Sequence, residues 1–156
     1  MSGEGQGEPA QPRPRSQRRA DALERLRGDV DLWVASADAE GNAYLIPLSY
    51  YWDGETLTIA TPRASRTGRN LVRAGWARVA LGNTRDVVVV EGPVEEVPIE
   101  ANTALADLYA QATGWDPRLE PEEHVYLKLT PRTVLAWRES NELKGRRLMR
   151  DGEWLD

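Results

Sequence analysis

The residues best suited to chemistry gather between positions 61 and 71, in the order Thr61-Pro62-Arg63-Ala64-Ser65-Arg66-Thr67-Gly68-Arg69-Asn70-Leu71. They run into a predicted helix over 65–74. The start of a helix offers unpaired N–H groups and the positive end of its dipole, which suits an anion. Arg66 and Arg69 add planar donors that match phosphate oxygens. The segment predicts a phosphate-binding site. The alternative is an ordinary capped helix with solvated arginines.

Composition excludes several kinds of chemistry. The chain of 156 residues has no Cys, so disulfides, thiolate zinc sites and cysteine nucleophiles are impossible. Its single histidine, His124, excludes a metal site built from several histidines. No Gly-x-Ser-x-Gly sequence is present, so His124 is better interpreted as a surface or interface residue than as a catalytic one.

Charge and hydropathy restrict the possible partners. The formal net charge is −5, which argues against general nucleic-acid binding. No apolar run approaches the roughly 20 residues that span a membrane, and no charged-then-apolar signal peptide opens the chain. We therefore expect a cytoplasmic protein that binds a small-molecule substrate rather than nucleic acid or a membrane.

The elements that would position the candidate site begin after a polar segment. Residues 1–16 have no large apolar side chain after Met1, so we expect a disordered tail followed by one domain over 17–156. A short helix is predicted over 18–27 and a strand over 31–37. Asp53-Gly54 is a two-residue hairpin signal that should join a strand over 44–52 to a half-buried strand containing Leu57 and Ile59. Gly75 should end the helix over 65–74.

The second half of the chain predicts more strands and one clear helix. Four consecutive valines, 87–90, favour a strand buried on both faces, and Gly92-Pro93 favours a bulge or bend. The segment 141–156 should be irregular but docked. Further strands are predicted over 76–81, 94–97, 125–130 and 134–137. A helix opened by Pro98 should bury a stripe of Ala101, Ala104, Leu105, Leu108, Tyr109 and Ala112.

These elements sum to six or seven strands joined mostly by short turns, with three helices. The pattern favours a mainly β fold, a small antiparallel barrel with peripheral helices. Three motifs in this order also resemble the pyridoxamine 5′-phosphate oxidase-like family, whose fold is the FMN-binding split barrel. They are 45–54 (Leu-Ile-Pro-Leu-Ser-Tyr-Tyr-Trp-Asp-Gly), 59–71 and 85–92 (Arg-Asp-Val-Val-Val-Val-Glu-Gly).

The resemblance implies a homodimer with flavin cofactors between the subunits. It implies that the ring system is contacted by Pro47, Leu48 and Ser49. It implies a phosphate held by Thr61, Ser65, Arg66 and Thr67, with support from Arg69 and Asn70. Asp86 occupies a strand position where a glutamine often contacts the flavin, and Trp137 matches an aromatic residue that reaches the other subunit's cofactor. No catalytic residue and no metal ligand is implied.

The same resemblance implies an FMN-dependent oxidoreductase that acts on a small organic substrate. Thr67 replaces the lysine of the family's Ser-Arg-Lys motif, and residues 147–150 only loosely match its C-terminal substrate motif. The chain is therefore more similar to a divergent branch than to a true pyridoxamine phosphate oxidase. Two alternatives stay open, a reductase dependent on the deazaflavin coenzyme F-420 and a flavin-binding protein without catalytic activity.

Overall fold

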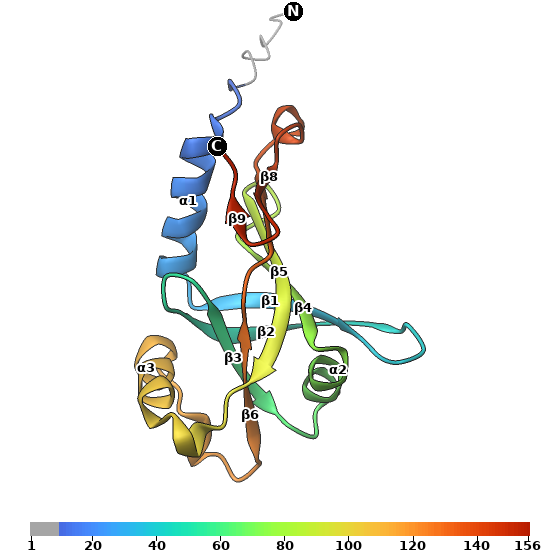
Figure 1. Cartoon of the computed structure of the whole chain (residues 1–156), viewed down its shortest axis with the longest axis vertical. Helices are drawn as coiled ribbons and strands as arrows, with labels where there is room; N and C mark the ends of the chain where they lie inside the picture. Colours follow the sequence, from blue (N-terminus) through green and yellow to red (C-terminus); the bar gives the residue numbers. More distant parts are fainter. Residues whose placement is uncertain (1–9) are drawn as a thin grey trace, which may run out of the picture.

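The computed structural model describes residues 10–156, which form a mainly β fold (Figure 1). The three α-helices are α1 (Arg15–Gly28), α2 (Arg66–Ala74) and α3 (Thr103–Thr113). The nine strands are β1 (Asp31–Ala37), β2 (Ala43–Trp52), β3 (Leu57–Pro62), β4 (Trp76–Leu81), β5 (Val87–Glu96), β6 (His124–Leu129), β7 (Thr133–Trp137), β8 (Arg147–Arg150) and β9 (Glu153–Trp154). In Figure 1, α1 and α3 lie on one side of the strands and α2 on the other.

Six of the strands close an antiparallel barrel, as the sequence predicts. Their order is β4-β1-β2-β3-β6-β5, and pairing between β4 and β5 completes the ring. The remaining strands extend outward from β5 in the order β7-β8-β9, which brings the total to nine rather than six or seven. The core is mainly aliphatic, with residues such as Val34, Leu57, Val90 and Leu148, and it also contains Tyr50.

Strand β5 joins the barrel to its extension because it changes partner along one edge. Its first half, from Val87 to Glu91, pairs with β7, whereas Val94 to Glu96 pair with β6. Gly92 lies at the change, and a Cβ atom there would collide with the carbonyl oxygen of Thr130. The predicted bulge does not form, because β5 is continuous and its pairing with β4 stays in register through Gly92 and Pro93. What changes here is the partner on the other edge, where the β6–β7 connection approaches Gly92 closely.

The first helix begins earlier than predicted. It starts at Arg15 rather than at residue 18, so the last two residues of the predicted tail belong to it. Arg13 donates to the carboxylate of Glu142 from Nε at 2.9 Å and from Nη2 at 2.8 Å. This ion pair orders the chain just ahead of the helix. Residues 1–9 of the predicted tail lie outside the described residues.

The hairpin after β2 differs from the expected two-residue turn. Trp52 pairs with Leu57, so four residues form the loop, and Gly54 has a φ of 103°. The Asp53 carboxylate instead accepts hydrogen bonds from the amides of Glu55 and Thr56. Strand β3 is buried along most of its length, against the expected half-burial, because core residues cover its inner face and α3 helps to cover the outer one.

The predicted stripe of the third helix is wrong in part. A 3₁₀ turn (Ile99–Ala101) follows Pro98, and α3 begins only after Asn102, whose side-chain oxygen accepts from the amide of Leu105. Leu105 and Tyr109 are buried as expected, together with Ala106. Leu108 is 44% exposed, so the buried face of the helix is rotated relative to the predicted one.

The C-terminal segment is a hairpin rather than an irregular tail. β8 pairs with both β7 and β9, and Leu148 and Met149 are buried, which confirms that the segment docks. The turn is Asp151-Gly152, and both residues have positive φ values, 52° and 82°. This is the two-residue turn geometry that an Asp-Gly pair favours. Among residues 10–156, no helix is long and apolar enough to cross a membrane.

Candidate functional site

The start of α2 is organised by Ser65. Its hydroxyl donates to the carbonyl oxygen of Pro62 at 2.7 Å and accepts from the amide of Gly68 at 3.0 Å, so Ser65 is the N-cap of α2 rather than its first residue, as the predicted range 65–74 had it. A Cβ atom on Gly68 would lie 2.5 Å from the Pro62 carbonyl oxygen. Glycine at this position therefore allows the first turn of the helix to lie directly against the end of β3.

Arg66 and Arg69 project from this first turn toward solvent. Neither guanidinium is paired with a carboxylate among residues 10–156, and Arg66 lies 4.9 Å from the ring centre of Tyr44 on β2. Together with Arg73 they line a pocket of about 550 Å³ between α2 and the β1–β2 turn, where Asp38 and Glu40 form part of the opposite wall. We call this the α2 pocket. It presents three guanidinium groups along one side of α2, from its first turn to its last, none of them paired with a carboxylate among residues 10–156.

Three of the other predicted site residues lie beneath this surface. Thr61 and Thr67 are buried, and the Thr61 hydroxyl lies 3.2 Å from that of Ser65. Thr67 is 0% exposed, and its Oγ1 has no hydrogen-bond partner. The amide of Asn70 donates to Ser36 Oγ at 3.1 Å, which ties α2 to β1. These residues support the helix start from below, while Arg66 and Arg69 form its surface.

The predicted ring-contacting residues lie on β2, the strand that also carries Tyr44. Pro47 is exposed, and Leu48 packs against the core. Ser49 donates from its hydroxyl to Asp31 at 2.7 Å, and its carbonyl oxygen accepts from the Tyr109 hydroxyl at 3.0 Å. Burial raises the pKa of the Tyr109 hydroxyl. At Ser49, β2 is thus held by α3 through its backbone and by β1 through its side chain.

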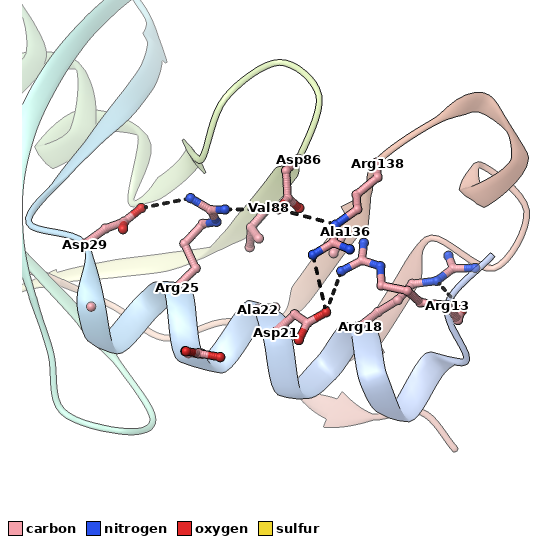
Figure 2. Close-up of a pocket in the computed structure, with 12 residues that line it drawn as sticks. Arg13, Arg18, Asp21, Ala22, Arg25, Asp29, Asp86, Val88, Ala136 and Arg138 are labelled. Atoms are coloured by element: carbon pink, nitrogen blue, oxygen red, sulfur yellow. Dashed lines mark hydrogen bonds and ion pairs between the residues drawn. The ribbon is translucent and has the colours of Figure 1, made fainter. Parts of the chain in front are cut away.

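Asp86 and Trp137 lie together, but apart from the α2 pocket. Val87, the residue after Asp86, pairs with Trp137 where β5 and β7 meet. Figure 2 shows Asp86 in a second pocket of about 360 Å³, facing α1. Its carboxylate lies 3.1 Å from Arg25 Nη2 and 3.4 Å from Arg138 Nε. No residue lines both pockets, so within one chain the predicted site residues form two groups.

Charged residues of alternating sign connect Asp86 to α1 and to the segment after β7. Figure 2 shows most of this network. Its members, in order of contact, are Glu142, Arg13, Asp21, Arg138, Asp86, Arg25 and Asp29, with N···O distances between 2.8 and 3.7 Å. Sequence analysis did not identify Arg25 and Arg138 as neighbours of Asp86, because their spacing along the chain carries no signal for this contact.

The outer face of the barrel carries an apolar row that crosses five strands. Backbone register places Pro47, Trp33, Ala80, Val89 and Leu135 side by side. We call these five residues the apolar row. Trp33 is 50% exposed, and Leu45 and Trp76 nearby are also exposed. Within the single chain, Val88 and Val90 are buried while Val87 and Val89 are half-buried, so the predicted burial of both faces is not met by this chain alone.

The closed barrel with a helix after its third strand defines a known class of fold. An FMN-binding protein from Nostoc punctiforme, described as related to pyridoxamine 5′-phosphate oxidase, aligns over 86% of this chain and 87% of its own, with 19% identity and a TM-score of 0.56. A protein named F420 reductase aligns over 71% of this chain and 93% of its own, with 17% identity and a TM-score of 0.60. These similarities show that the chain has the split-barrel fold.

The sequence gives the family directly. The family model described as pyridoxamine 5′-phosphate oxidase matches residues 21–138, and the chain belongs to this family. A further structure of the same fold is PhzG from Burkholderia lata, solved in complex with tetrahydrophenazine-1-carboxylic acid. It aligns over 99% of this chain and 94% of its own, with 20% identity and a TM-score of 0.59. No curated protein matches the chain.

Proposed function

We propose that the protein is a flavin-dependent oxidoreductase that binds FMN, with the cofactor's phosphate held at the start of α2. The observation that carries the proposal is the pair of exposed arginines, Arg66 and Arg69, on a helix start capped by Ser65. Neither has a carboxylate partner within residues 10–156. Fork-shaped cationic donors beside the positive end of a helix dipole fit a phosphate dianion. The α2 pocket, at about 550 Å³, falls in the size range of cofactor sites.

When bound, FMN would supply the hydride or electron chemistry, and the protein would bind and orient it. Arg66 and Arg69 would hold the phosphate, while Thr61, Thr67 and Asn70 fix the helix beneath them. Pro47, Leu48 and Ser49 would run along the ring system. We place the flavin ring system along β2 because Tyr109 and Asp31 anchor this strand through hydrogen bonds to Ser49. We assign no protein acid or base.

We further propose that the working unit is a homodimer. The apolar row and its exposed neighbours form a surface of the kind that a second subunit covers. Asp86 and Trp137 do not line the α2 pocket of their own chain. A role for either at the cofactor therefore requires that a second copy brings them to it. The two proposals support each other, because one arrangement would bury the apolar row and complete the site.

A deazaflavin-dependent reductase is the second candidate, and a specific observation favours it. The unpaired arginines continue from Arg66 and Arg69 to Arg73, which donates to the carbonyl oxygen of Ala37. This extended cationic wall would accommodate the long anionic tail of coenzyme F-420. The substitution of Thr67 for the family's lysine and the partial motif at 147–150 argue against a true pyridoxamine phosphate oxidase. A flavin-binding protein without turnover remains the third alternative.

Parallel titrations with FMN and coenzyme F-420, followed by absorption spectroscopy, test these alternatives. The proposal predicts retention of FMN after gel filtration, with shifted flavin bands. Exclusive retention of coenzyme F-420 would instead establish the second candidate. Retention of neither cofactor would refute the phosphate site at α2. Retention without turnover by any supplied reductant or acceptor would leave a flavin-binding protein.

A further inference from the structure

Arg66 differs from the ion-paired arginines of the chain in the group that holds its guanidinium. Arg63 and Arg118 are typical of the paired ones, because each donates to two carboxylates. Arg66 has no carboxylate partner among residues 10–156, and its Cζ atom instead lies over the ring of Tyr44, 4.9 Å from the ring centre. An aromatic ring, rather than an anion, therefore holds this arginine.

A contact with an aromatic ring leaves the donors of a guanidinium available. The group carries five N–H donors in one plane, and a bidentate carboxylate partner takes up two of them. The face of an aromatic ring attracts the cation through its quadrupole and does not take up this pair of donors. Arg66 can therefore be held by Tyr44 and still present paired donors to the oxygens of a phosphate.

The place of Tyr44 beside α2 is set by the pairing of β1 with β2. Ser36 and Tyr44 are directly opposite each other in this register, so their side chains point to the same face of the sheet. Ser36 Oγ accepts a hydrogen bond from the side-chain amide of Asn70 at 3.1 Å. Asn70 lies four residues after Arg66, on the same side of the helix. One side of α2 thus contacts one cross-strand pair, and the hydrogen bond of Asn70 fixes the helix beside Tyr44.

The α2 pocket also contains acidic side chains that would compete for Arg66. Asp38 and Glu40 line it together with the arginines. The Asp38 carboxylate already accepts hydrogen bonds within its own turn, whereas Glu40 has no ion-pair partner among residues 10–156. If Arg66 turned to pair with Glu40, its donors would be lost to a phosphate. The contact with Tyr44 opposes this pairing.

We propose that Tyr44 is a positioning residue for the phosphate site, and that it holds the guanidinium of Arg66 with its N–H donors free for the ligand. Tyr44 does not line the α2 pocket, so its role is exerted through Arg66. This inference rests on the proposed function and deepens it. Tyr44→Leu should weaken FMN binding about two- to fivefold, the range expected for an exposed cation–π contact, whereas Tyr44→Phe keeps the ring and should bind FMN as the unmodified chain does.

A double-mutant cycle separates this role from a direct contact with the cofactor. Dissociation constants of FMN are measured by flavin fluorescence for the full chain and its variants. In an Arg66→Gln background, Tyr44→Leu should have no further effect, because the ring has no guanidinium left to hold. Arg69→Gln is the matched background, and there the two- to fivefold loss should persist, because Tyr44 contacts Arg66. Circular dichroism verifies that all variants are folded.

The possible failures of this experiment can be told apart. An equal loss from Tyr44→Leu with and without Arg66 would overturn the inference, as would a loss in Tyr44→Phe as large as that in Tyr44→Leu. Unchanged affinity in Tyr44→Leu, with a loss of tenfold or more in Arg66→Gln, would refute the role of Tyr44 and leave the phosphate site intact. Unchanged affinity in Arg66→Gln, or absence of FMN binding, would refute the phosphate site and the role of Tyr44 with it.

Discussion

At the scale of single residues, Arg66 is the side chain most directly tied to the proposed phosphate site. Arg66→Ala removes a charge-assisted contact worth about 1.5–3 kcal/mol, so the dissociation constant of FMN should rise at least tenfold. Fluorescence titration of the flavin measures this change. Arg27→Ala, which removes an exposed arginine from α1, is the control and should leave the affinity unchanged. An unaltered affinity in Arg66→Ala would mean that the phosphate binds elsewhere.

Glu142 is a buried carboxylate whose charge should contribute to stability. It is 3% exposed, and hydrogen bonds from Arg13 hold its pKa at about 2, well below its ordinary value of 4.5. A carboxylate with a lowered pKa in the folded state contributes stability that is complete above the unfolded-state value and is lost as the pH falls toward the folded-state value. This contribution should therefore disappear between about pH 4.5 and pH 2.

Glu142→Gln tests this contribution. The substitution leaves the buried guanidinium of Arg18 and that of Arg13 without their common carboxylate, so the free energy of unfolding at pH 7 should fall by about 3 kcal/mol. Urea denaturation at pH 7 and at pH 3 measures the difference. The loss should be smaller at pH 3, where part of the stabilisation is already absent. An equal loss at both values would refute the role of the charge.

At the scale of elements, Gly92 is essential to the branching of β5. Gly92→Ala would force a Cβ atom against the Thr130 carbonyl oxygen, so the backbone would have to separate where β5 exchanges β7 for β6. We expect destabilisation of more than about 3 kcal/mol, measured by thermal or urea unfolding. Gly28→Ala is the matched control, because nothing lies within 4 Å of the added atom. Similar effects of the two substitutions would contradict the close approach.

The elements also show which parts of the fold local sequence can predict. β1 (Asp31–Ala37) and β4 (Trp76–Leu81) have the predicted bounds, because each alternates between inside and outside for most of its length. The end of α2 at Gly75 was predicted from another local signal, a glycine after the last helical residue, whereas Ser65 was predicted as the first helical residue and is instead the N-cap. β8 was missed because Leu148 and Met149 are consecutive and both buried, so no alternation exists.

The other errors have two causes, a local side-chain contact that was not recognised and contacts between residues distant in sequence. Asp-Gly occurs twice, and it forms the tight turn at Asp151-Gly152 but a wider loop after Asp53, where the aspartate side chain accepts backbone amides. The start of α1 depends on Arg13 contacting Glu142, which no local pattern reveals. The residues proposed to hold the phosphate are contiguous in sequence, so local sequence alone was enough to propose them. The separation of Asp86 and Trp137 from these residues could not be predicted, because it depends on barrel closure.

At the scale of the whole molecule, the apolar row predicts how copies associate. Trp33→Asp places a charge within the row, at its large exposed aromatic residue, so a dimer formed through this face should be weakened by about 30-fold or more. Sedimentation velocity across a concentration series measures the dissociation constant. Leu119→Asp is the control, since Leu119 is 83% exposed but lies outside the row. An undisturbed dimer in Trp33→Asp would place the interface on another face.

The order of strands in the barrel also bears on how fast the chain folds. The β4–β5 pair forms between neighbours in sequence, but Leu57 of β3 pairs with Leu129 of β6 across nearly half of the chain. Closing so long a loop costs entropy before any contact compensates for it, and proteins dominated by such pairings fold in milliseconds to seconds. We expect the β3–β6 pairing to limit the folding rate, so substitutions at this seam should slow refolding more than those in the C-terminal hairpin.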